Sequence, residues 1–144
     1  MIKILICGLP GSGKTTLAEL LSKSLLTSVW LNADEVRNYY DDWDFTPEGR
    51  TRQSHRMKYL SDGVVRGGNI AIADFIAPTQ AIRDYYDADY VIWMNTITKG
   101  RFEDTNAMFE KVQFADYVVT EKDVTNQIVD IVEDIKKRIG EENE

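Results

Sequence analysis

The chain has 144 residues, of which 43% are hydrophobic and 28% are charged, as in a folded domain rather than a disordered chain. Its net charge of −7 argues against broad binding to nucleic acid or to an anionic membrane surface. No apolar run reaches membrane-spanning length, and the single cysteine, Cys7, excludes an internal disulfide. We therefore expect one domain over residues 1–144, cytoplasmic and without a membrane partner; homodimer formation is left open.

Residues 8–16 fit the phosphate-binding pattern G-x-x-x-x-G-K-[ST], the P-loop or Walker A motif, at every fixed position. An apolar run at 2–7 predicts a strand before the motif, and leucine spacing at 14–26 predicts a helix after it. Loop amides and the positive end of that helix are expected to hold the phosphates of ATP, with Lys14 on the β- and γ-phosphates and Thr15 on Mg²⁺. The predicted nucleotide-binding residues are Gly8, Leu9, Pro10, Gly11, Ser12, Gly13, Lys14, Thr15 and Thr16.

The second predicted strand covers residues 28–31, and the polar cluster that follows it contains Asp34. Ligands bind at the carboxyl ends of strands in α/β sheets, so Asp34 is a candidate to take a proton from an acceptor hydroxyl. The alternative is that Asp34 only supplies a favourable charge to a helix that begins at Asn32 or Ala33, and the two roles are compatible.

An acidic and aromatic loop at 41–45 precedes a long helix that is expected to begin with Thr46 as N-cap and Pro47 in its first turn. The first half of this helix is basic. Two interpretations remain open: the basic half binds an anionic substrate, or it is a solvated face.

The third predicted strand, 69–73, ends in Asp74, as in a Walker B segment whose aspartate binds Mg²⁺. The alternative is an acid that merely ends a strand. The remaining predicted elements are a helix at 79–86, strands at 90–94 and 117–119, and a helix at 123–139. This alternation predicts an α/β fold of the three-layer P-loop NTPase type, a five-stranded parallel sheet with helices on both faces.

Residues 95–110 are polar and are expected to form a short lid-like segment. Within it, Arg101 is a candidate to neutralise charge on the phosphoryl group in transfer. The predicted catalytic residues are therefore Lys14, Asp34 and Arg101.

These segments together resemble the adenylylsulfate kinases, which use ATP to phosphorylate the 3′-hydroxyl of adenosine 5′-phosphosulfate. Residues 8–18 match the loop of that family closely, and residues 31–37 look like its L-D-G-D-N-V-R segment. Residues 45–50 are similar to its G-F-S-x-x-D-R segment, and residues 75–78 to its F-I-S-P.

The resemblance implies roles for individual residues. It makes Asp34 the acid near the acceptor hydroxyl, Arg37 and Arg50 contacts to the phosphosulfate, and Phe45 one face of a stack on the adenine. Beyond the resemblance, we expect Phe109 or Phe102, from the short lid-like segment, to supply the opposite face. The implied acceptor-binding residues are Asp34, Arg37, Phe45, Arg50, Gln53, Phe75, Ile76 and Phe109.

The chain also departs from the family pattern. Ala77 replaces a serine, Gln53 stands where an asparagine is usual, Asp74 replaces a small residue, and the long lid of the family has only a short counterpart. We predict transfer of the ATP γ-phosphate to adenosine 5′-phosphosulfate or a related small anionic acceptor. The alternatives are another small-molecule or nucleotide kinase, a polynucleotide 5′-hydroxyl kinase, and a nucleotide-binding module with little catalysis.

Overall fold

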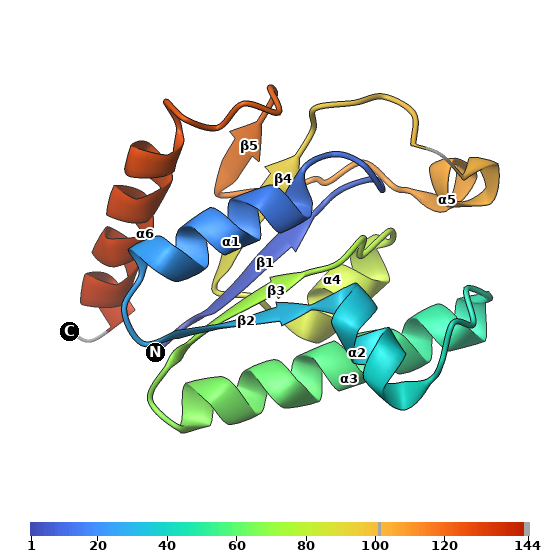
Figure 1. Ribbon diagram of the computed structural model, residues 1–144, viewed down its shortest axis with the longest axis horizontal. Coiled ribbons are helices and arrows are strands. Elements are labelled where there is room, and N and C mark those ends of the chain that lie inside the picture. Colours follow the sequence, from blue (N-terminus) through green and yellow to red (C-terminus); the bar gives the residue numbers. More distant parts are fainter. Residues whose placement is uncertain (101, 143–144) are drawn as a thin grey trace.

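The computed structural model describes residues 1–100 and 102–142 (Figure 1). Its centre is a five-stranded sheet in the order β2-β3-β1-β4-β5, and every pair of neighbouring strands is parallel. The strands are β1 (Lys3–Cys7), β2 (Ser28–Asn32), β3 (Ile70–Asp74), β4 (Tyr90–Met94) and β5 (Tyr117–Val119). The parallel sheet and its covering helices confirm the predicted three-layer α/β P-loop fold.

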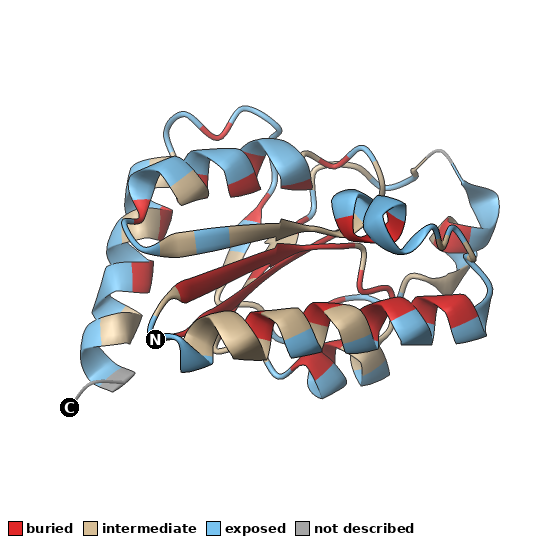
Figure 2. Ribbon diagram, turned by 60° about the horizontal axis from the view of Figure 1, so that its bottom comes forward, coloured by how far each residue is buried: buried red, intermediate tan, exposed pale blue. Residues whose placement is uncertain are grey.

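Helices cover both faces of the sheet because side chains alternate along the buried strands. On β1, Ile4 and Ile6 pack with α1 and α6, whereas Leu5 and Cys7 pack with α3 and α4. β1 and β3 are buried along their whole length, as the red strands of Figure 2 show. The helices are α1 (Lys14–Ser24), α2 (Ala33–Tyr40), α3 (Pro47–Arg66), α4 (Gln80–Tyr86), α5 (Glu103–Met108) and α6 (Ile128–Glu142). Within residues 1–100 and 102–142, no helix combines the length and the apolar character that crossing a membrane requires.

The start of α3 agrees with the sequence pattern. The Thr46 hydroxyl accepts a hydrogen bond from the main-chain N–H of Gly49 at 3.2 Å, and Pro47 is the first helical residue. A methyl group at Gly49 would overlap the main chain and side chain of Asp44. The loop before α3 therefore packs directly on the first turn of that helix.

Most element ends lie within two residues of the prediction, but the last helix and the lid-like segment differ more. The last helix begins at Ile128 instead of 123, because the Asp123 carboxylate accepts the N–H of Thr125 and holds a separate turn before the helix. The expected lid-like segment contains the short helix α5, which the sequence pattern did not reveal.

The contact at Gly49 gives a stability test. Gly49→Ala should lower the free energy of unfolding by about 1–3 kcal/mol, because the added methyl group overpacks against Asp44. Gly63 lies in the same helix, and a methyl group there would lie 3.7 Å from Arg66 Nη2, its nearest side-chain neighbour. Gly63→Ala should therefore stabilise the protein by about 0.5–1 kcal/mol. Urea unfolding of both variants measures the difference, and equal stabilities would contradict the packing of this loop on α3.

Candidate active site

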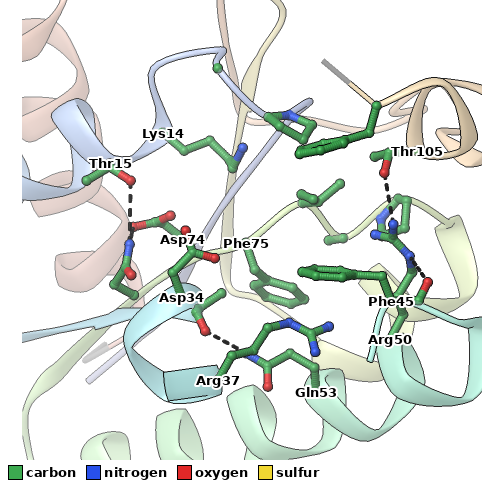
Figure 3. Close-up of a pocket in the computed structure, with 18 of the residues that line it drawn as sticks. Lys14, Thr15, Asp34, Arg37, Phe45, Arg50, Gln53, Asp74, Phe75 and Thr105 are labelled. Atoms are coloured by element: carbon green, nitrogen blue, oxygen red, sulfur yellow. Dashed lines mark hydrogen bonds between the residues drawn. The ribbon is translucent and has the colours of Figure 1, made fainter. Parts of the chain in front are cut away.

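A cavity of about 800 Å³ opens where β1, β2 and β3 end (Figure 3). Its walls come from the glycine-rich loop, the start of α2, the loop before α3, the turn after β3, and the segment around α5. The structure brings most of the predicted site residues together in this one cavity: Pro10, Gly11, Gly13, Lys14, Thr15, Thr16, Asp34, Arg37, Phe45, Arg50, Gln53, Asp74, Phe75 and Ile76. Gly8, Leu9 and Ser12 belong to the same loop and are buried behind this wall.

The glycine-rich loop is shaped to receive an anion. Gly11 and Gly13 have φ values of 84° and 102°, in the left-handed region that favours glycine. α1 starts directly after Gly13, with no side-chain cap and no acidic residue in its first turn. The helices α2, α3 and α4 are capped by side chains, and the uncapped α5 carries Glu103 and Asp104 in its first turn, so the start of α1 is where a phosphate would serve as the cap.

Lys14 is the first residue of α1, and its side chain folds back onto this loop. Its Nζ donates to the main-chain oxygens of Gly8 at 3.0 Å and Leu9 at 2.9 Å, and the side chain is buried. A phosphate bound at the loop would compete with these carbonyl oxygens for the ammonium group. Lys14 is therefore held close to the place where the sequence motif predicts its role.

Asp74 and Thr15 both line the cavity, and the side chain of Asn32 lies between them. Asn32 Nδ2 donates to Asp74 Oδ2 at 3.0 Å and lies 3.5 Å from the Thr15 hydroxyl oxygen. Mg²⁺ in nucleotide sites is usually held by one or two protein oxygens together with phosphates and water, and this donor set fits that ion. Among residues 1–100 and 102–142, no three His, Cys, Asp or Glu side chains form a cluster that could hold a metal without such help.

Asp34 is exposed in the first turn of α2 and lines the same cavity. The Asn32 side chain caps this helix by accepting the N–H of Glu35 at 3.0 Å. The position of Asp34 is therefore compatible with both interpretations, because it is an acid in a first helical turn and it lines the cavity.

The two arginines of the acceptor side are ordered by the loop before α3. Arg37 Nη1 donates to the main-chain oxygens of Asp42 and Asp44, at 3.0 and 3.1 Å. Arg50 Nε donates to the Phe45 main-chain oxygen at 2.9 Å. Both arginines are buried, and burial lowers the pKa of each guanidinium. Within the basic half of α3, Arg50 is therefore not part of a solvated face, whereas Arg52 and His55 are exposed.

Aromatic rings line the same half of the cavity. The Phe45 ring lies 4.4 Å from the Arg37 guanidinium and 5.5 Å from that of Arg50, and it stays 43% exposed. Trp43 and Phe102 also contribute to the wall. A flat base could stack on these surfaces.

The structure does not place Phe109 in the cavity wall, so its predicted stacking role has no support there. Its ring lies 5.0 Å from the Arg83 guanidinium and packs with the core beneath α4. The sequence did not distinguish it from Phe102, because both are apolar residues of one segment without a clear period. Arg101 falls outside the described residues.

Sequence reasoning missed several lining residues. Arg50 Nη2 donates to the buried hydroxyl of Thr105 at 2.9 Å, which fixes α5 to the start of α3. Asp104 and Lys122 also line the cavity, from α5 and from the loop after β5. None of the three belongs to a recognisable motif; only the placement of Lys122 shortly after a predicted strand hinted at the sheet edge.

The fold and this site define a P-loop domain with the architecture of small-molecule kinases. The sequence model of the adenylylsulphate kinase family matches residues 1–95, well over half of the chain. The chain therefore belongs to the adenylylsulphate kinase family. The match ends just after β4, so the segment around α5 lies beyond it.

Individual relatives agree with this assignment over part of their length. An adenylyl-sulfate kinase from Staphylococcus haemolyticus is 38% identical over 88 residues, which cover 58% of this chain and 44% of that protein. A probable adenylyl-sulfate kinase from Pyrococcus abyssi is 34% identical over 87 residues, which cover 57% of this chain and 50% of that protein. The match thus spans half or less of each of these relatives.

Solved structures show the same fold over nearly the whole chain. An APS kinase from Mycobacterium tuberculosis superposes with a TM-score of 0.74 at 18% identity, covering 96% of each chain. A shikimate kinase from Acinetobacter baumannii gives a TM-score of 0.58 at 19% identity, covering 99% of this chain and 94% of the other. At these identities the likeness concerns the fold alone.

The burial of Asp74 predicts a pH dependence of stability. Burial raises the pKa of this carboxyl above its ordinary value, although the Trp30 and Asn32 donors partly oppose the shift. The folded state therefore binds the proton more tightly than the unfolded chain, and the protein loses stability as the pH rises between the two pKa values. Asp74→Asn should gain stability relative to the unmodified protein as the pH rises from about 4 to about 7.

Thermal unfolding of the nucleotide-free proteins across this pH range measures the effect. Asp130→Asn, at an exposed position of α6, is the matched control and should show no such trend. If the unmodified protein instead became more stable relative to Asp74→Asn as the pH rises, the buried carboxylate would be net stabilising in its charged form.

Proposed function

We propose that the protein is an ATP-dependent phosphotransferase that moves the γ-phosphate of ATP to a hydroxyl of a small acceptor. The observation that carries this proposal is the continuous cavity. The anion-binding loop with Lys14 lies at one end, Arg37 and Phe45 lie at the other, and Asp34 lies between them, beside Asp74. Phosphoryl transfer depends mainly on holding two substrates in line and neutralising charge, and this arrangement provides for both.

At the nucleotide end, the loop amides and Lys14 bind the phosphates, and Thr15 and Asp74 would hold Mg²⁺. The ion would neutralise charge that develops between the β- and γ-phosphates. The Lys14 ammonium leaves the loop carbonyls for the phosphate oxygens, so its position depends on the bound nucleotide.

At the acceptor end, Asp34 accepts the proton of the attacking hydroxyl or orients it. It lies in the first turn of α2 and lines the same cavity as the P-loop. Arg101 stays a candidate for charge neutralisation from the lid-like segment.

For the acceptor, we propose adenosine 5′-phosphosulfate or a close anionic nucleotide relative. The support is family membership together with the exposed Phe45 ring and the two guanidinium groups beside it. Among the structures with this fold, an APS kinase from Mycobacterium tuberculosis has been solved in complex with AMPPNP and APS. We also propose that the protein is cytoplasmic and forms a homodimer. Among structures with this fold, an APS kinase from Thiobacillus denitrificans is described as hexameric.

A second acceptor class is favoured by one observation. The Arg37 and Arg50 donors are already engaged with main-chain oxygens and Thr105, and Asp104 adds an acid to the same wall. This arrangement suits an acceptor with less negative charge, such as a nucleoside or another polyol. If neither class of acceptor increases ADP release, the protein is a nucleotide-binding module with little catalysis.

The test is ADP release from ATP with and without adenosine 5′-phosphosulfate, and then with uncharged hydroxyl compounds. Lys14→Ala should lower the release rate by about 100-fold or more, because it removes the charge that meets the phosphates. Lys137→Ala, exposed on α6, should change nothing. An unchanged rate in Lys14→Ala would exclude the kinase assignment.

The two strand-end acids should give different phenotypes. Asp34→Asn should lower kcat by about 100-fold with ATP affinity nearly unchanged, as expected for a group that serves the hydroxyl. Asp74→Asn should instead raise the Mg²⁺ concentration needed for half-maximal rate. Glu35→Gln, next to Asp34 but outside the cavity wall, is the control; exchanged phenotypes would reverse the two assignments.

The acceptor side should be separable from ATP binding. Arg50→Ala and Phe45→Ala should raise the acceptor KM by about 10-fold or more, since each removes a contact to a charged group or an aromatic surface. ATP affinity should remain within a factor of about two, as in the control Arg66→Ala at the far end of α3. An equal loss of ATP affinity would show that these residues serve ATP binding and not the acceptor.

A further inference from the structure

Two uncharged groups donate hydrogen bonds to one oxygen of the Asp74 carboxylate. Trp30 Nε1 donates to Asp74 Oδ2 at 2.8 Å, and Asn32 Nδ2 donates to the same oxygen at 3.0 Å. Among the described residues, both hydrogen bonds to this carboxylate end on Oδ2, so Oδ1 is the oxygen left to meet a cation. Asp74 is only 3% exposed, and two hydrogen bonds from β2 therefore fix its orientation.

The donors are suited to this task because they carry no charge. A lysine or arginine in their place would neutralise the carboxylate and weaken its attraction for a cation. An indole and an amide hold the group in one orientation while its negative charge remains available.

Asn32 also connects three elements of the site. It is the register partner of Asp74 in the parallel pair of β2 and β3. Its Oδ1 accepts the Glu35 N–H and caps α2, the helix that carries Asp34. Its Nδ2 reaches Asp74 and lies next to the hydroxyl of Thr15 at the start of α1.

We propose that Asn32, supported by Trp30, is a positioning residue that orients Asp74 Oδ1 toward the Mg²⁺ of the bound nucleotide. This inference rests on the proposed function, because it assumes that Asp74 and Thr15 hold that ion. It adds two residues from β2 to the metal site, and it makes one amide responsible for both the carboxylate and the cap of α2.

The substitution Asn32→Asp separates these two duties. Aspartate caps a helix as well as asparagine does, so α2 keeps its N-cap. The donor to Asp74 is lost, however, and a like charge is placed beside it. The expected result is a fall in Mg²⁺ affinity of the ADP complex by about 10- to 100-fold, the usual effect of losing a partner that orients a metal ligand.

Calorimetric titration of Mg²⁺ into the protein with saturating ADP measures this shift without any acceptor. The affinity for ADP in the absence of Mg²⁺ should stay unchanged. Asn38→Asp, the same substitution at an exposed position of α2, is the matched control. Trp30→Phe removes the other donor without adding charge and should lower Mg²⁺ affinity in the same direction.

Three results would overturn the inference. Unchanged Mg²⁺ affinity in both Asn32→Asp and Trp30→Phe would leave Asn32 as a helix cap only. Tighter Mg²⁺ binding in Asn32→Asp would show that a carboxylate at position 32 binds the ion itself. An equal loss of Mg²⁺-free ADP affinity would indicate general distortion of the loop.

Failure of the proposed function would look different. If the unmodified protein transfers no phosphate to any acceptor but Asn32→Asp still weakens Mg²⁺ binding, the catalytic proposal fails and the positioning role stands. If Asn32→Asp does not fold, the same titration on Trp30→Phe decides the question.

Discussion

The parallel register of β1, β3 and β2 is the constraint on which the site depends. It pairs Ile6 with Asp74 and Asp74 with Asn32, so the three strands end side by side. The P-loop follows β1, α2 with Asp34 follows β2, and the turn at Phe75 follows β3. Segments far apart in the sequence thus reach one edge without a long linker, and reversing any of these strands would carry its polar end to the opposite edge.

The acceptor half depends on a different interaction, hydrogen bonds from buried or half-buried arginines to a loop that has no regular structure. Arg37 and Arg50 hold the loop from within, and Arg52 and Arg56 hold it from outside through Asp42, at 2.7 and 2.6 Å. These two guanidinium groups keep the pKa of Asp42 far below its usual range. The cations that would meet an anionic acceptor therefore also order the loop, which links acceptor binding to loop structure.

The sequence predicted the parts that local rules control. Strand positions and helix starts follow from apolar patterns and from caps such as Thr46, and the P-loop is a contiguous motif with a fixed shape. Contacts between side chains of segments far apart in the sequence could not be predicted in this way. The pairing of Asn32 with Asp74 requires the register, the bond from Arg50 to Thr105 requires the packing of α5, and the choice of Phe102 over Phe109 for the cavity wall depends on how that short helix turns.

The central claim is that one cavity joins ATP to an acceptor hydroxyl for direct transfer. The most direct measurement follows the label of γ-phosphate-labelled ATP in the presence of adenosine 5′-phosphosulfate and of uncharged hydroxyl compounds. We predict that the label appears on an acceptor, at a rate that depends on acceptor concentration and that falls by about 100-fold in Asp34→Asn. Label that appears only as inorganic phosphate, at one rate with or without any acceptor, would contradict direct transfer.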